Sequence, residues 1–125
     1  MSVYKILIVD DEPDLAHLLA IALKKKGYQT VLAGNGEEGL AKIKSEQPHL
    51  VIFDIKMPRM DGYTFVRAVR KDAASAAIPL IALTSYDMKD IFAMEGVNYY
   101  FMKAVQMDEL FQALEKLLPA NQEAS

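Results

Sequence analysis

Five short apolar runs recur along the chain, and they predict five β-strands. The first, third and fourth runs are continuously apolar rather than alternating, which is typical of strands covered on both faces in a parallel sheet. The distance between successive runs leaves room for one helix in each connection. The runs are Ile6–Val9, Thr30–Ala33, Leu50–Phe53, Ile78–Leu83 and Val97–Met102.

The segments between these runs have helical spacing. In the first connection, apolar residues recur at intervals of three and four from Leu15 to Leu23, which is the spacing of one helix face. Pro13 suits the first turn of this helix, and Gly27 suits its end. The other predicted helices are marked by the capping residues Asn35 and Asp61 and by a last leucine-rich stretch that ends at Pro119.

This alternation of strands and helices predicts a (βα)5 chain. Parallel strands joined by right-handed crossovers form an α/β three-layer sandwich, with helices on both faces of a five-stranded sheet. The chain has 125 residues, of which 52% are hydrophobic and 25% charged, so neither a disordered nor a fibrous class is supported. We expect residues 1–119 to form one domain and residues 120–125 a polar tail.

Composition narrows the classes of function. The chain has no cysteine, which excludes disulfides, thiolate nucleophiles and cysteine-ligated metal sites. It shows neither a long uncharged stretch nor a signal peptide, so we expect a cytoplasmic protein without membrane contact. The net charge is −3, and the single basic run, Lys24–Lys26, is better explained by a helix C-terminus, so we expect no nucleic-acid binding by this domain.

Polar residues stand where the apolar runs end, and ligands bind at that edge in open α/β sheets. Each residue alone has a structural explanation, such as a helix cap or a turn. Their joint occurrence at the ends of four predicted strands instead favours one shared site. The residues are Asp10 and Asp11 after the first run, Asp54 after the third, Thr84 after the fourth and Lys103 after the fifth.

Three clustered carboxylates repel one another unless a cation lies between them. Oxygen ligands without histidine or cysteine favour Mg²⁺ over zinc, and Mg²⁺ and Lys103 together would balance the three negative charges. Such a site suits phosphoryl transfer, which is catalysed chiefly by positioning and charge neutralisation. A carboxylate can itself accept the phosphoryl group, and Asp54, on the middle strand, is the predicted acceptor.

Four segments of the chain resemble the signature of response-regulator receiver domains of two-component signalling. The most specific is the run Asp-x-x-Met-Pro-x-Met-Asp-Gly, and the resemblance extends over nearly the whole chain. It implies a flavodoxin-like, chemotaxis-receiver-like fold with strand order 2-1-3-4-5. It also implies autocatalytic transfer of a phosphoryl group from a histidine of a partner kinase to Asp54. The segments are Val9–Pro13, Asp54–Gly62, Leu83–Ser85 and Tyr100–Lys103.

The resemblance also implies a ligand set for Mg²⁺. Asp11 and Asp54 would ligate the ion directly, and Asp10 would act through water. The backbone carbonyl of Lys56, two residues after the acceptor, would complete the protein ligands.

The remaining matched residues would contact the phosphoryl group or respond to it. The resemblance implies that the Thr84 hydroxyl donates a hydrogen bond to the phosphoryl group and that Lys103 pairs with one of its oxygens. Tyr100 would turn inward when Thr84 moves, which shifts the population of the face built from the fourth helix, fifth strand and fifth helix. The implied partners are a sensor histidine kinase or phosphotransfer protein and a downstream protein target. We expect a phosphorylated switch that dephosphorylates itself, a monomer or weak dimer rather than a turnover enzyme.

Two departures from the family pattern bear on this expectation. Lys103 is followed by Ala104, where the family has proline after a cis bond. A non-proline cis bond costs about 2.5 to 4 kcal/mol, so we expect a trans bond, looser Lys103 geometry and a lower transfer rate or phosphoryl lifetime. The segment 86–95, the predicted fourth helix, is also roughly one turn short. These departures motivate an alternative, a receiver-like interaction scaffold that is not efficiently phosphorylated.

Three other functions fit the residues less well. An aspartate-nucleophile phosphatase would need Asp-x-Asp-x-Thr after the first strand, and Asp10–Asp14 does not match it. A flavin-binding module would need a phosphate loop where this chain is acidic. A phosphohistidine carrier would need a helical bundle around His17 or His49. Lys56 and Tyr86 flank the expected path of the attacking water, and they either slow hydrolysis or are simply solvated.

Overall fold

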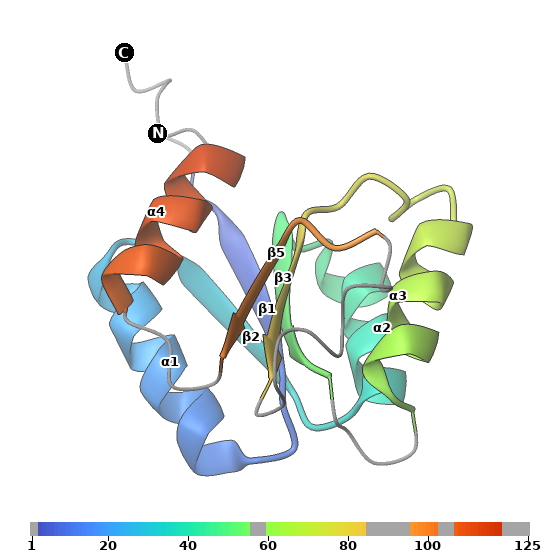
Figure 1. Cartoon of the computed structure of the whole chain (residues 1–125), viewed down its shortest axis with the longest axis horizontal. Coiled ribbons are helices and arrows are strands. Elements are labelled where there is room, and N and C mark those ends of the chain that lie inside the picture. Colours follow the sequence, from blue (N-terminus) through green and yellow to red (C-terminus); the bar gives the residue numbers. More distant parts are fainter. Residues whose placement is uncertain (1–2, 56–59, 85–95, 103–106, 119–125) are drawn as a thin grey trace.

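The computed structural model describes residues 3–55, 60–84, 96–102 and 107–118, and its strands form one five-stranded parallel sheet (Figure 1). The strand order is β2-β1-β3-β4-β5, so the predicted order is confirmed. The strands are β1 (Lys5–Val9), β2 (Gln29–Ala33), β3 (Leu50–Asp54), β4 (Leu80–Thr84) and β5 (Tyr99–Met102).

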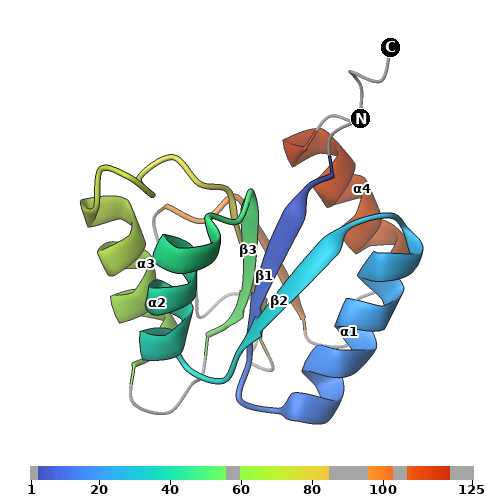
Figure 2. The same ribbon diagram turned by 180° about the vertical axis from the view of Figure 1, so that it is seen from behind.

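The described residues contain four helices, which cover both faces of the sheet. Figures 1 and 2 show α2 and α3 on one face and α1 and α4 on the other, so the predicted α/β three-layer sandwich is confirmed. The predicted helix in residues 86–95 and the predicted tail in residues 120–125 lie outside the described residues. The helices are α1 (Pro13–Lys25), α2 (Gly36–Glu46), α3 (Gly62–Lys71) and α4 (Met107–Leu117).

Two strands start later than their apolar runs predict. β4 begins at Leu80 rather than Ile78, because the Ile78 backbone N–H donates to the Ser75 carbonyl in the preceding turn (3.1 Å). β5 begins at Tyr99 rather than two residues earlier, because the Asn98 side chain turns back and its Oδ1 accepts from the Leu80 N–H (2.8 Å). Local hydrogen bonds therefore make both strands begin two residues later than their apolar runs.

The core is divided by the sheet into two layers. One cluster lies between the sheet and the α2–α3 side, where the Phe53 and Phe65 rings pack with centroids 5.3 Å apart. The other lies on the α1–α4 side and includes Leu23 and Leu114. The central strand β3 is buried along its whole length, as its continuous apolar run predicts.

Helix α1 turns an unexpected side toward the sheet. Its buried residues are Ala16, Ala20 and Leu23, whereas Leu15 and Leu18 from the predicted apolar stripe are 40% and 64% exposed. The short alanine side chains allow the helix backbone to lie close to the sheet. As a result α1 presents large apolar side chains to solvent.

The amino ends of the strands are held by side-chain contacts. Lys5 Nζ forms an ion pair with Glu46 Oε1 at 3.0 Å. The Lys5 backbone N–H donates to His49 Nδ1 at 3.0 Å, and the His49 ring packs edge-on against Tyr4. Together with the bond between Leu80 and Asn98, these contacts hold the amino ends of the strands. The opposite edge of the sheet, where the strands have their carboxyl ends and where Asp10 and Asp54 lie, is called the rim below.

The predicted helix caps are confirmed at α2 and α3. Asn35 Oδ1 accepts from the Glu38 N–H at 2.8 Å, and Glu38 Oε1 accepts from the Gly34 N–H at 2.8 Å. At α3, Asp61 Oδ1 accepts from the Thr64 N–H at 2.8 Å.

No helix of the described chain combines the length and the apolar character needed to cross a bilayer.

The Asp61 cap makes stability depend on pH. The hydrogen bond from the Thr64 N–H holds the pKa of Asp61 below its usual value, so its stabilisation is present above the unfolded pKa and is lost as pH falls through the folded pKa. We expect Asp61→Ala to lower the free energy of unfolding by about 1 kcal/mol at neutral pH, measured by urea denaturation.

Asp61→Asn is the matched control, because asparagine keeps the accepting oxygen but does not titrate. This variant should retain most of the stability and lose the pH-dependent part. Equal losses in both variants at neutral pH would contradict a role for the accepting oxygen.

Candidate functional site

Two buried carboxylates meet at the carboxyl end of the sheet. Asp10 follows β1, where its backbone N–H donates to the Ala33 carbonyl (3.0 Å), and Asp54 is the last residue of β3. β1 and β3 are paired so that Val9 lies opposite Phe53. Only 8% of Asp10 and 5% of Asp54 are exposed. The structure thus brings these two residues of the predicted site together at one edge of the sheet.

Glu12 is the third member of this cluster. One carboxylate oxygen each from Asp10, Glu12 and Asp54 lies within 4.8 Å of the others. The backbone N–H of Glu12 donates to Asp10 Oδ1 at 2.9 Å, which closes a tight turn between the end of β1 and the start of α1. An oxygen-only donor set of this size fits a hard divalent cation such as Mg²⁺.

The rest of the predicted ligand set is not found in the cluster. Asp11 is exposed and lies outside the group of described residues that could hold an ion. Lys56, whose carbonyl was the fourth predicted ligand, lies outside the described residues. Sequence reasoning missed Glu12, although its position directly before Pro13 marks it as the residue where the chain turns into α1.

Thr84 is the last residue of β4, the strand next to Asp54. Asp54 is paired with Leu83, and Thr84 with Met102, the residue before Lys103. The backbone order at this edge is therefore the one that the sequence predicts. Lys103, Ala104 and Tyr86 lie outside the described residues, so their predicted roles stay predictions.

Tyr100 lies on the α2–α3 side of β5. It is partly buried, is paired with Ala82 and packs against the core cluster of that side. Burial, and after it the proximity of Tyr63, raises the pKa of the Tyr100 phenol. The tyrosine thus lies among core partners in this structure, and its movement remains a prediction.

Gly62, the first residue of α3, packs against the backbone next to Asp54. Its backbone N–H donates to the carbonyl of Ile55, the residue after Asp54, at 2.7 Å. A Cβ on Gly62 would lie 2.8 Å from the Ile55 Cα and 3.0 Å from its carbonyl oxygen. The start of α3 therefore lies directly against the backbone that carries Asp54, which only glycine allows.

A family comparison agrees with this geometry. Residues 6–115 match the family model of the response regulator receiver domain. The chain belongs to this family. The family resemblance predicted from the sequence is therefore confirmed.

Relatives of this receiver domain include proteins of similar length. PilH from Pseudomonas aeruginosa is 36% identical over 117 residues, which cover 91% of this chain and 97% of PilH. Sporulation initiation phosphotransferase F from Bacillus subtilis is 36% identical over 118 residues, 92% of this chain and 94% of that protein. The receiver domain spans about half the length of other relatives, such as the probable transcriptional regulators ycf27 of Cyanophora paradoxa (48%) and Porphyridium aerugineum (52%).

Solved structures show the same fold. TrrA from Thermotoga maritima, crystallised in complex with Mg²⁺-BeF, superposes with a TM-score of 0.84 and is 36% identical, covering 93% of this chain and all of TrrA. CheY4 from Vibrio cholerae has a TM-score of 0.86 at 28% identity, with 94% of this chain covered. The strand order of this receiver domain is thus that of its family.

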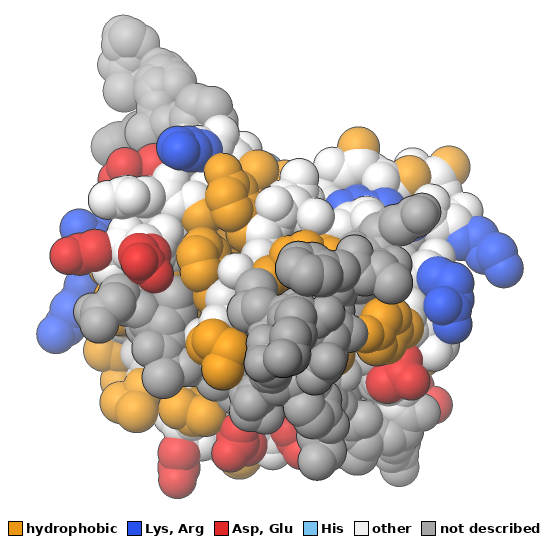
Figure 3. Space-filling view, viewed as in Figure 1, with side chains coloured by type: hydrophobic (Ala, Val, Ile, Leu, Met, Phe, Trp, Pro, Cys, Tyr) orange, Lys and Arg blue, Asp and Glu red, His pale blue; other side chains and the backbone are white. Residues whose placement is uncertain are grey.

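An apolar groove lies beside the acidic cluster. It encloses about 230 Å³ between α1, the end of β4 and the start of α4. Figure 3 shows apolar side chains gathered at the lower left over α1, next to acidic side chains at the lower edge. The receiver domain therefore combines a charged site with an apolar surface on one side of it. The groove is lined by Asp10, Leu15, Leu18, Leu19, Ala22, Leu83 and Met107.

Proposed function

We propose that this receiver domain accepts a phosphoryl group on Asp54 from a phosphohistidine of a partner protein, with Mg²⁺ in the acidic cluster. The observation that carries the proposal is the cluster itself, in which oxygens of Asp10, Glu12 and Asp54 lie within 4.8 Å of one another at the end of the central strand. Membership of the receiver family supports it. So do two similar proteins, sporulation initiation phosphotransferase F and TrrA, which was crystallised in complex with Mg²⁺-BeF.

The proposed reaction exchanges one bond to phosphorus for another. A carboxylate oxygen of Asp54 attacks the phosphorus, a P–O bond forms, and the P–N bond to the partner histidine breaks. The imidazole leaves with the bonding electron pair and takes up a proton. A bound Mg²⁺ would neutralise charge on the transferred oxygens. Hydrolysis by water later restores the Asp54 carboxylate, so the domain acts as a timed acceptor rather than a turnover enzyme.

The burial of Asp54 fits this role. The carboxylate is held at the end of a fully buried strand, so its position is fixed before the donor arrives. Preorganisation of this kind contributes to transfer, because a well-oriented donor and acceptor react without a further entropy cost. Asp10 and Glu12 hold the cation site on the side of β1 and α1, which leaves the side toward β4 for the phosphoryl group.

The partner in this proposal is a sensor histidine kinase or a phosphotransfer protein. Its histidine must come within bonding distance of Asp54, so its surface must cover the rim around the cluster. The exposed side chains of Leu15 and Leu18 adjoin that rim and offer apolar area to a partner. The proposal places the protein in the cytoplasm, where kinases generate phosphohistidine from ATP.

The test is the intact mass of the protein after incubation with a small acyl-phosphate donor and Mg²⁺. We expect one added phosphoryl group on the wild type, and none on Asp54→Asn or when the metal is chelated. An adduct that persists in Asp54→Asn would contradict the assigned acceptor. If the wild type takes no adduct, the protein is instead a receiver-like interaction scaffold, the alternative that Ala104 and the short segment 86–95 motivate.

A further inference from the structure

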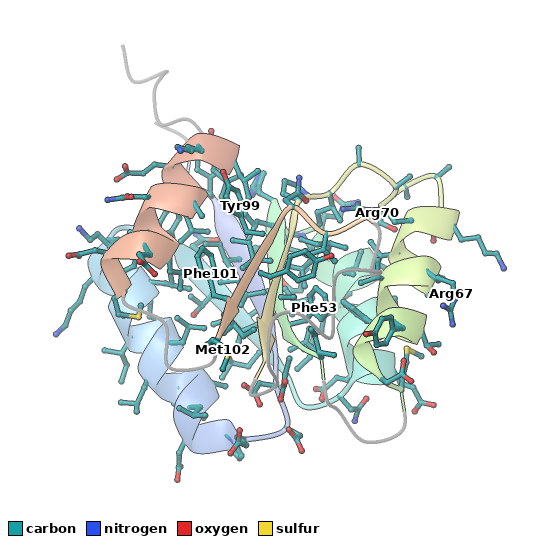
Figure 4. All side chains as sticks on the ribbon, in the orientation of Figure 1. Phe53, Arg67, Arg70, Tyr99, Phe101 and Met102 are labelled. Atoms are coloured by element: carbon teal, nitrogen blue, oxygen red, sulfur yellow. The ribbon has the colours of Figure 1, made fainter. Side chains whose placement is uncertain are left out.

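Arg70, on the last turn of α3, binds three backbone carbonyls on two separate loops. Its Nε and Nη2 donate to the Gly96 carbonyl at 3.0 and 2.6 Å. Its Nη1 donates to the carbonyls of Ala76 and Ile78 at 2.9 and 2.6 Å. In the described part of the chain these carbonyls, and not a carboxylate, are its hydrogen-bond partners. Figure 4 shows Arg70 between α3 and the sheet, whereas Arg67 points outward.

Gly96 fits closely against this guanidinium. Its φ of +88° is one that side-chain-bearing residues rarely adopt. A Cβ there would lie 3.3 Å from Arg70 Cγ and Nε and 3.3 Å from Val66 Cγ1. The backbone at Gly96 is therefore held against α3 in two ways: its carbonyl oxygen accepts two hydrogen bonds from the Arg70 guanidinium, and its Cα packs closely against α3 side chains. Burial also lowers the pKa of Arg70.

The contact between Arg70 and Gly96 lies just before the start of β5. Gly96 is three residues before Tyr99, where β5 begins, and four before Tyr100. Asn98 ties the same segment to β4, because its backbone N–H donates to the Leu80 carbonyl at 2.9 Å. In the described sheet β5 has only β4 as a neighbour, and Arg70 links the segment that enters β5, at Gly96, to the segment that enters β4, at Ile78.

We propose that Arg70 is a positioning residue of the receiver switch: by holding Gly96 on α3 it sets where the chain enters β5 and thereby the position of Tyr100. The inference rests on the proposed function, since a switch at Tyr100 has meaning only if Asp54 is phosphorylated. Arg70 touches neither Asp54 nor the acidic cluster, so it acts through the backbone of residues 96–100. Lysine cannot replace it, because an ammonium has no planar fork to bind two carbonyls from one position.

The test compares Arg70→Lys with Arg67→Lys, an exposed arginine one turn earlier on the same helix. Amide hydrogen exchange of residues 96–102 should be about tenfold faster in Arg70→Lys and unchanged in Arg67→Lys. Amides of β1 and β3 should change much less in both. The fluorine NMR signal of Tyr100 in fluorotyrosine-labelled protein, assigned with Tyr100→Phe, should shift in Arg70→Lys and not in Arg67→Lys.

Gly96→Ala disturbs the same contact without changing a charge, and we expect it to reproduce both effects. Unchanged exchange at residues 96–102 in Arg70→Lys, or a uniform increase over all strands, overturns the positioning role. The mass of the acyl-phosphate adduct is measured on the wild type in parallel. No adduct there overturns the proposed function and with it the switch role, whereas a normal adduct with unchanged exchange overturns the Arg70 inference alone.

Discussion

Replacing Gly62 with alanine is expected to lower the free energy of unfolding by about 3 kcal/mol. The new Cβ would meet the Ile55 Cα at 2.8 Å and the Ile55 carbonyl oxygen at 3.0 Å, and the Phe53 ring at 3.3 Å. Two of these atoms are backbone, so no side-chain rotation relieves the overlap. Either α3 or the end of β3 must move. Denaturation in urea, monitored by circular dichroism, measures the loss.

Gly34→Ala is the control for this prediction. Gly34 lies in the turn before α2, as Gly62 lies at the start of α3, yet its new Cβ would contact only Glu38 Oε1 at 3.5 Å, an ordinary van der Waals distance. Its unfolding free energy should stay within about 0.5 kcal/mol of the wild type. If Gly62→Ala is as stable as Gly34→Ala, the close approach of α3 to Ile55 is not what requires glycine.

Replacing Asp10 with asparagine is expected to weaken Mg²⁺ binding by at least about tenfold. The amide keeps nearly the same shape but removes one of three carboxylates from a site whose attraction for the ion depends on their charge. Isothermal titration with MgCl₂, without any phosphoryl donor, measures the affinity directly. Asp14→Asn, an exposed change on α1 outside the cluster, should bind Mg²⁺ like the wild type, and a normal affinity in Asp10→Asn would remove Asp10 from the site.

The same titration identifies the third carboxylate. The motif predicts that Asp11 ligates the ion, whereas the structure places Glu12 in the cluster and Asp11 outside it. A larger loss in Glu12→Gln than in Asp11→Asn would support the cluster as it stands. The reverse would mean that the ion draws Asp11 inward when it binds.

The parts of the fold that the sequence predicts well are those with a single physical cause. β1 and β3 are covered on both faces, so their apolar runs are continuous and unambiguous. The position of Asp10 and Asp54 at one edge then follows from parallel pairing alone. No contact between distant side chains is needed to place them.

Other features depend on contacts that the sequence does not display. α1 is apolar over a wide arc, so spacing alone could not decide that Ala16 and Ala20 face the sheet while Leu18 does not. Glu12 joins the cluster through a turn closed by its own N–H on Asp10. From the sequence alone, Arg70 looks like an ordinary cation at the end of a helix. Its partner carbonyl at Gly96 lies 26 residues away, so no local pattern reveals the contact.

The contacts at the amino ends of the strands have an evolutionary consequence. The Lys5–Glu46 ion pair and the bond from Leu80 to Asn98 are separated from the acidic rim by strands of five residues, roughly 16 Å at the usual rise per residue. Substitutions at that distance without shared partners affect a protein independently. Residues at the acidic rim can therefore change in descendants of this chain, and with them whatever the rim binds, while the opposite end continues to hold the sheet together.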